Sequence, residues 1–226
     1  MFVGHYAASF LAKAEEPSAP LWSYFTAAQL LDIGWSAFIM VGVEKMRVDP
    51  ALPGSVFDLY YMPWTHSLLG AVAWSIAGAL FFRWLLRLPA RAALFIGLVV
   101  FSHWILDLLV HRPDLLLWPG GPKVGFALWN APVLEEAIEM GLLAACAAIW
   151  VPGHVRRGGT IWSAAGLLVL LAVMQSFVIA VPPHGGNIAI GLTVLGAYLV
   201  ISLSAYFAER GTLSRLGNSE RPATVP

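Results

Sequence analysis

Five side chains that can carry a charge or bind a metal stand among apolar residues in the first half of the sequence: His5, Asp32, His66, His103 and Asp107. An ionised group at the centre of a bilayer costs at least about 2.5–3.5 kcal/mol, so such residues are informative by position alone. His103 and Asp107 are four residues apart, which in a helix places both on one face, about 6 Å apart along the axis. A pair in this arrangement can bind one ion. Imidazole with carboxylate suits zinc first, with manganese or iron as alternatives.

His111 continues the same helix face four residues further on, which suggests a second ion or a supporting role beside the first. Three acidic residues, Glu135, Glu136 and Glu139, follow in a later apolar segment. Other interpretations remain open. A single histidine inside a membrane often hydrogen-bonds to a neighbouring helix, and His–Asp pairs also form proton relays in transporters. A haem held by paired histidines fits less well, because it has no need of the carboxylates Asp32 and Asp107.

The composition indicates that lipid surrounds most of the chain. Of its 226 residues, 59% are hydrophobic and 12% are charged, and the mean hydropathy is +0.75. Soluble domains carry about 25% charged residues, which they need to cover their surface. The formal net charge is zero, so the chain has no electrostatic reason to bind nucleic acid.

The apolar segments predict an all-α polytopic membrane protein. A spanning helix needs about 20 apolar residues, and we expect about six full transmembrane helices plus a short N-terminal membrane helix, at 2–12, 23–43, 66–86, 91–111, 127–151, 161–181 and 187–208. These form one membrane-embedded domain, residues 1–208. A polar tail, 209–226, follows and is expected to be unstructured from Gly211 onward.

The basic residues predict the orientation. Eight of the 13 lie in or beside the 87–90 turn, the 152–160 loop and the tail: Arg83, Arg87, Arg91, Arg156, Arg157, Arg210, Arg215 and Arg221. Basic residues gather on the cytoplasmic side, so these three regions and the C-terminus are expected there, and the His/Asp residues fall in the outer half of the membrane. Tryptophans near helix ends fit an aromatic belt: Trp22, Trp64, Trp118 and Trp129. His154 and His184 fall in loops and are expected to be solvated.

Four motifs occur in an order that resembles a known family: GHYAASF (4–10), LLDIGW (31–36), WTHSLLGA (64–71) and SHWILDLLVHRPDLLLWP (102–119). They look like those of the YdjM-type inner-membrane metal-dependent hydrolases, over about residues 4–130. The resemblance implies a metal site formed by His5, Asp32, His66, His103 and Asp107, and a bacterial inner membrane location. The chain departs from the family pattern after Asp32, where Gly34 and Trp35 replace a further ligand.

The expected function is hydrolysis at an outward-facing metal site, with Zn²⁺ lowering the pKa of its water towards about 7. His111 and Glu136 are the candidates for a supporting or general-base role. A site at the membrane surface suits an amphiphilic substrate, such as a phospholipid or another phosphoester or amide. The alternative is a transporter, permease or metal-binding protein that uses the same His/Asp residues as an ion or proton path. Transport predicts polar residues continuing to the cytoplasmic face, whereas the inner halves of the segments are largely apolar.

Overall fold

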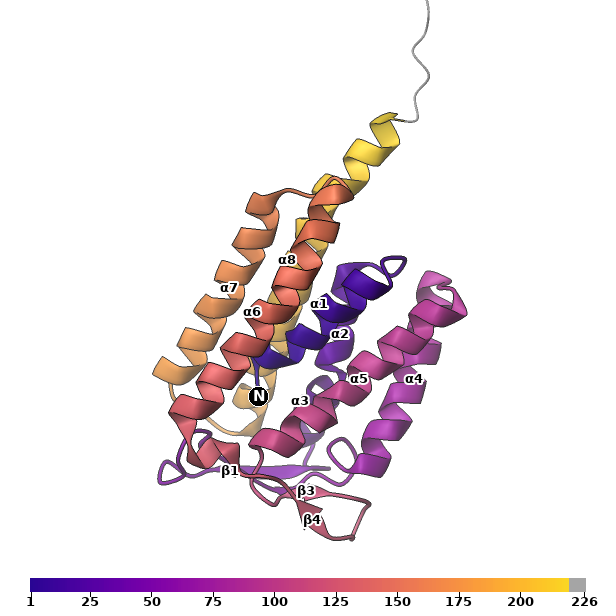
Figure 1. Ribbon diagram of the computed structural model, residues 1–226. Coiled ribbons are helices and arrows are strands. Elements are labelled where there is room, and N and C mark those ends of the chain that lie inside the picture. The colour runs from indigo at the N-terminus through magenta and orange to yellow at the C-terminus, as the bar shows by residue number, and fades with distance from the viewer. Residues whose placement is uncertain (220–226) are drawn as a thin grey trace, which may run out of the picture.

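The computed structural model describes residues 1–219, with side chains for residues 1–210, as a mostly helical bundle (Figure 1). Within this part of the chain, five helices are long and apolar enough to cross a membrane: α4 (Leu68–Leu86), α5 (Ala90–Val110), α6 (Pro132–Arg156), α7 (Ile161–Ala180) and the Asn187–Arg210 part of α8 (Asn187–Ser219). Side-chain hydrogen bonds cap the first turns of two of these helices. Ser67 caps α4 by accepting the Gly70 amide at 3.0 Å, and Thr160 caps α7 by accepting the Ser163 amide at 3.0 Å. The chain is therefore a helical membrane protein.

The N-terminal third is built from short helices. A 3₁₀ turn, η1 (Val3–His5), leads into α1 (Tyr6–Glu15), which packs on α2 (Leu21–Ala28) and α6. The continuous helix expected over 23–43 is instead two helices, α2 and α3 (Leu30–Met40), separated at Gln29. The expected count of about six full spans is thus not confirmed. Gln29 is fully buried and its side-chain amide donates to the Phe2 carbonyl at 3.0 Å, so the helix break is held from within the protein.

The two ends of the bundle differ in character. The α4–α5 turn, the α6–α7 turn and the end of α8 lie together at one end (Figure 1). These are the three arginine-rich regions. The predicted orientation requires them to lie on one side of the membrane, and they do lie at the same end of the bundle. At the opposite end the connections form two small antiparallel sheets, β1 (Lys45–Val48) with β2 (Phe57–Tyr61) and β3 (Leu115–Leu116) with β4 (Lys123–Val124), followed by η2 (Leu128–Asn130). The all-α expectation omitted these hairpins.

The outer surface of the bundle is apolar, as contact with lipid requires. Trp84 on α4 is 76% exposed and Trp162 on α7 is 81% exposed, both near the arginine-rich end. Trp64 and Trp118 are exposed at the opposite end, as an aromatic belt predicts. Trp129 was assigned wrongly to that belt, because it is buried.

The predicted unstructured tail is in part helical, since α8 continues as far as Ser219. Residues 220–226 lie outside the part of the chain that the structure describes.

Candidate metal centre

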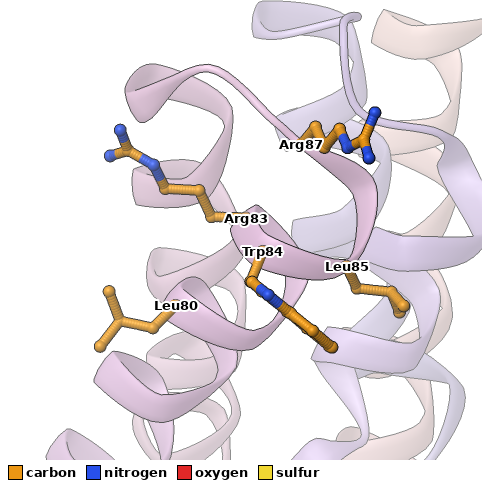
Figure 2. Close-up of a pocket in the computed structure, with 5 residues that line it drawn as sticks. All are labelled: Leu80, Arg83, Trp84, Leu85 and Arg87. Carbon is orange, nitrogen blue, oxygen red and sulfur yellow. The ribbon is translucent and has the colours of Figure 1, made fainter.

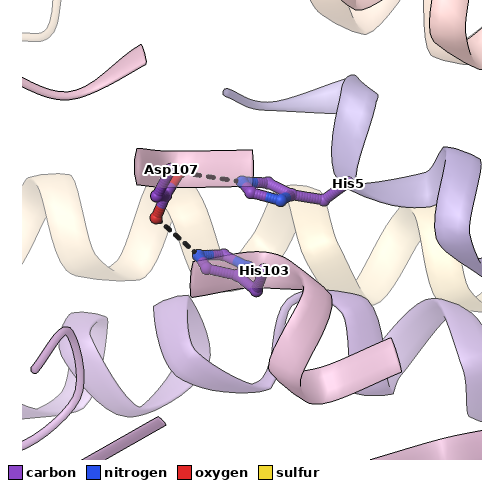
Figure 3. A group of neighbouring side chains, drawn as sticks. All are labelled: His5, His103 and Asp107. Carbon is purple, nitrogen blue, oxygen red and sulfur yellow. Dashed lines mark ion pairs between the residues drawn. The ribbon is translucent and has the colours of Figure 1, made fainter. Parts of the chain in front are cut away.

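Four separate elements bring the five predicted residues together. His5 ends η1, Asp32 lies in the first turn of α3, and His66 precedes the N-cap of α4. His103 and Asp107 lie one turn apart on the buried face of α5. Their side chains form two overlapping groups whose ligating atoms lie within 4.8 Å of one another: His5, His103 and Asp107, and Asp32, His66 and His103. Figure 3 shows the first group, with both histidine rings turned towards the Asp107 carboxylate.

The spacing of the ligating atoms suits a shared ion. The histidine Nε2 atoms lie 3.1–3.6 Å from oxygens of Asp32 and Asp107. A tetrahedral zinc ion with bonds of about 2.0–2.1 Å places neighbouring ligand atoms about 3.3–3.4 Å apart. Nε2 of His5 and Nε2 of His103 are buried and have no hydrogen-bond partner. Buried polar atoms are normally satisfied, so the donor set and its unpaired atoms fit a divalent cation.

Hydrogen bonds at Nδ1 aim two of these rings. Nδ1 of His103 lies 2.7 Å from the Ala28 carbonyl, which can only accept, so Nδ1 carries the proton. Nδ1 of His66 lies 2.7 Å from the Thr65 hydroxyl, which gives its only proton to Glu44 at 2.6 Å. His66 must therefore also donate from Nδ1. When these rings are neutral, the lone pair is on Nε2, facing the aspartates, as for metal-ligating histidines held by an outer partner.

His111 joins the cluster by the same arrangement. Its Nδ1 lies 2.8 Å from a carboxylate oxygen of Asp114, and its Nε2 lies 3.5 Å from Asp107. The Trp129 ring packs against it at a centroid distance of 4.1 Å. This contact explains why Trp129 is buried. His111 is thus placed beside the five predicted ligands rather than free at a helix end.

The centre is closed except at Asp32. The side chains of His5, His66, His103 and Asp107 are at most 3% exposed, whereas that of Asp32 is 19% exposed. One oxygen of Asp32 faces His66 and His103, and the other accepts a 2.5 Å hydrogen bond from the Tyr198 hydroxyl on α8. Asp32 is therefore the most exposed side chain of the five.

Glu136 belongs to a different group. Glu135, Glu136 and Glu139 form an acidic cluster on α6. Glu136 accepts a 2.8 Å hydrogen bond from the Gln175 amide on α7. The structure gives Glu136 no contact with the His/Asp cluster, and its predicted general-base role stays a prediction.

His154 and His184 were both expected in solvated loops, but they differ in burial. His184 is exposed. His154 was assigned wrongly, because it lies within α6, is 2% exposed and bonds Ser163 at 2.9 Å.

Sequence reasoning missed the outer partners Thr65, Glu44, Asp114 and Tyr198. Two of them had a local signal: Thr65 adjoins His66, and Asp114 follows His111 by three residues. Glu44 and Tyr198 lie far from their partners in the sequence, so no local signal pointed to them.

A surface hollow of about 660 Å³ lies elsewhere on the molecule. It is at the arginine-rich end of α4 and is lined by Leu80, Arg83, Trp84, Leu85 and Arg87 (Figure 2). The arginines point away from each other, and no histidine or acid lines the hollow. It is remote from the His/Asp cluster, which lies at the other end of α4.

The fold and the cluster define a polytopic helical membrane protein with a buried His/Asp centre. Comparison of the chain with known protein families, curated proteins and solved structures gives no match. The resemblance to the YdjM-type hydrolases therefore rests on the four sequence motifs alone.

Proposed function

We propose that this protein is a membrane-bound metal-dependent hydrolase of the bacterial inner membrane, with a cytoplasmic C-terminus. One observation carries the proposal: three histidines direct Nε2 towards two aspartates, and the Nδ1 of each lies within hydrogen-bonding distance of an outer partner. Hydrogen bonding between helices would not require three rings aimed at one point. Two of the partners, the Ala28 carbonyl and the Asp114 carboxylate, are of the kinds that orient metal ligands in proteins, and the third, the Thr65 hydroxyl, is itself bonded to a carboxylate, that of Glu44.

His5, Asp32, His66, His103 and Asp107 would hold the ion, with Zn²⁺ favoured by the mixed nitrogen and oxygen donors. When bound, such an ion supplies a Lewis acid that activates water for attack at neutral pH. His111 extends the donor set, and Asp114 holds its ring. The partial exposure of Asp32 offers an approach from within the membrane domain. A lipid or another amphiphile, such as a phosphoester, is the proposed substrate class.

The alternative, an ion or proton path through the same residues, is disfavoured by what lies below the cluster. From His5, helix α1 runs towards the arginine-rich end of the bundle (Figure 1). Along this direction Phe10, Phe25 and Trp150 are fully buried and pack ring on ring, at centroid distances of 5.3 and 4.8 Å. A path needs polar groups or water along its length. These aromatics supply none, and the buried polar groups that α1 also carries, Ser9 and Lys13, are already bonded to the Tyr24 carbonyl and to Glu209.

Elemental analysis of the purified protein tests the proposal first. We expect bound zinc, or manganese or iron, near stoichiometric amounts, and hydrolysis of one member of a panel of phosphoester and lipid substrates. A protein that binds no divalent metal even after supplementation refutes the metal centre. Metal binding without turnover, combined with ion or proton flux across vesicles, would instead support the transport alternative.

A further inference from the structure

Glu139 on α6 binds the N-terminal arm, which we define as Phe2–His5. One carboxylate oxygen accepts the backbone N–H of Phe2 at 2.6 Å and that of Gly4 at 2.7 Å. The other oxygen accepts the side-chain amide of Gln175 at 3.2 Å. Glu139 is 1% exposed, so these bonds form away from solvent. The carboxylate thus links the arm to α6 and α7.

The arm carries the one histidine of the cluster whose ring has no outer partner. Nδ1 and Nε2 of His5 both lack a hydrogen-bond partner, although the ring stacks on His103 at 3.8 Å with planes 4° apart. The Nδ1 atoms of His66, His103 and His111 are each held by an acceptor. Apart from its contacts with His103 and Asp107 inside the cluster, His5 is therefore positioned by the backbone of the arm, in which Gly4, the residue before it, is bonded to Glu139.

We propose that Glu139 is a positioning residue for the metal centre, acting on His5 through the amides of Phe2 and Gly4. The effect on metal binding rests on the proposed function, whereas the contact between Glu139 and the arm does not. It gives one member of the acidic cluster a definite role. It also makes α6, which lies outside the region of family resemblance, part of the site.

The close approach of the two elements supports this role. A Cβ atom on Gly4 would lie 2.9 Å from Cγ of Glu139, closer than side chains normally come. Gly4 therefore lets the arm reach the carboxylate. A substitution on either side of this contact should loosen the arm, and the two substitutions change different chemical groups.

Three variants separate a positioning role from a general loss of packing. Glu139→Leu removes the acceptor and leaves two buried N–H groups unpaired. Glu139→Gln keeps an amide oxygen that can accept both N–H groups. Its new NH2 group can donate to the Gln175 amide oxygen, which has no partner in the native contact, once that amide turns over, so the variant should restore the arm. Gly4→Ala disturbs the contact without changing the carboxylate. Thr193→Val, whose hydroxyl bonds only the Ala189 carbonyl of its own helix on the exposed surface, is the control.

The full-length protein in detergent is measured in two ways. Amide hydrogen exchange of the peptide covering residues 1–10 reports the Gly4 bond whether or not metal is present. Competition with a chelator measures Co²⁺ affinity, and the Co²⁺ absorption spectrum reports the ligand set. We expect Glu139→Leu and Gly4→Ala to raise exchange of the arm, to weaken Co²⁺ binding about 10–100-fold and to change the spectrum. Glu139→Gln should stay near wild type on all three.

Each outcome decides the inference. Unchanged exchange in Glu139→Leu overturns it, and so does raised exchange with unaltered affinity and spectrum, because His5 would then not depend on the arm. If Glu139→Gln changes the exchange of the arm, the Co²⁺ affinity and the Co²⁺ spectrum as much as Glu139→Leu does, the inference is also overturned. A wild-type protein that binds no Co²⁺ refutes the proposed function separately. In that case the exchange data alone judge the contact with Glu139.

Discussion

Thr65 offers a sharp test of the metal centre, because its hydroxyl is the middle of a buried chain of three groups. Glu44 accepts from the Thr65 hydroxyl at 2.6 Å and also from the backbone N–H groups of Trp64 and Thr65 at 2.8 and 2.9 Å. The same hydroxyl oxygen accepts from Nδ1 of His66 at 2.7 Å. Thr65 and Glu44 are both 0% exposed. Thr65→Val removes the hydroxyl and nearly preserves the shape.

The size of the effect follows from the bonds lost. A hydrogen bond to a charged group contributes about 1.5–3 kcal/mol. Loss of an outer partner of a metal ligand lowers metal affinity about 10–100-fold, which corresponds to about 1.4–2.8 kcal/mol at 25 °C. The first figure applies to the bond between Thr65 and Glu44 and to folding stability, and the second applies to metal binding. We therefore expect Thr65→Val to weaken Zn²⁺ binding by about one to two orders of magnitude. The ring of His66 loses its orientation but stays in place.

Chelator competition on purified protein measures this change, and Thr193→Val again controls for the loss of a hydroxyl. Glu44→Gln supplies the second arm of a double-mutant cycle. Thr65 and Glu44 act in series on His66, so the double variant should be much less affected than the sum of the single changes. A Thr65→Val protein that binds Zn²⁺ within a factor of two of wild type would refute this account of how His66 is aimed.

Three further predictions address the centre and the topology. His103→Ala should remove both bound metal and turnover, whereas His184→Ala, in an exposed loop, should change neither; metal analysis and the substrate panel check this, and retained metal in His103→Ala would contradict it. Zn²⁺ affinity should fall as the pH drops, because protons compete with the metal for the imidazole nitrogens; a pH-independent affinity in chelator titrations would argue against histidine ligands. Reporter fusions at Gly159 and Gly121 should read as cytoplasmic and external respectively; the reverse result would invert the predicted orientation.

The sequence predicted the helical membrane class and most of the spans because both depend on local composition. Runs of about 20 apolar residues have few alternatives to a spanning helix. The pair on α5 was equally accessible, since one helix fixes the geometry of His103 and Asp107. Trp129 and His154 were misjudged for the opposite reason. Their burial depends on how distant elements pack, and their position near a segment end carried no information about it.

Long-range partners were beyond sequence reasoning for a related reason. Tyr198 reaches Asp32 across 166 residues, and Glu139 reaches Gly4 across 135 residues. Such contacts depend on tertiary packing, which a periodic pattern within one segment does not encode. The partners that sequence reasoning could have found are the local ones, Thr65 and Asp114.

The break between α2 and α3, the main departure from the expected helices, has a role in the site. Ala28 is the last residue of α2, and the final carbonyls of a helix have no partner within it. The Ala28 carbonyl is the group that accepts Nδ1–H of His103. A continuous helix over 23–43 would bond this carbonyl to the amide four residues on, that of Asp32, and leave His103 without its outer acceptor.

The interruption also starts a new helix at Leu30, which places Asp32 in a first turn, where the helix dipole favours a carboxylate. In a membrane, irregular backbone is tolerated only where protein covers it or water reaches it, and here Gln29 is fully buried. The departure from regular structure therefore both orients His103 and stabilises the charge of Asp32.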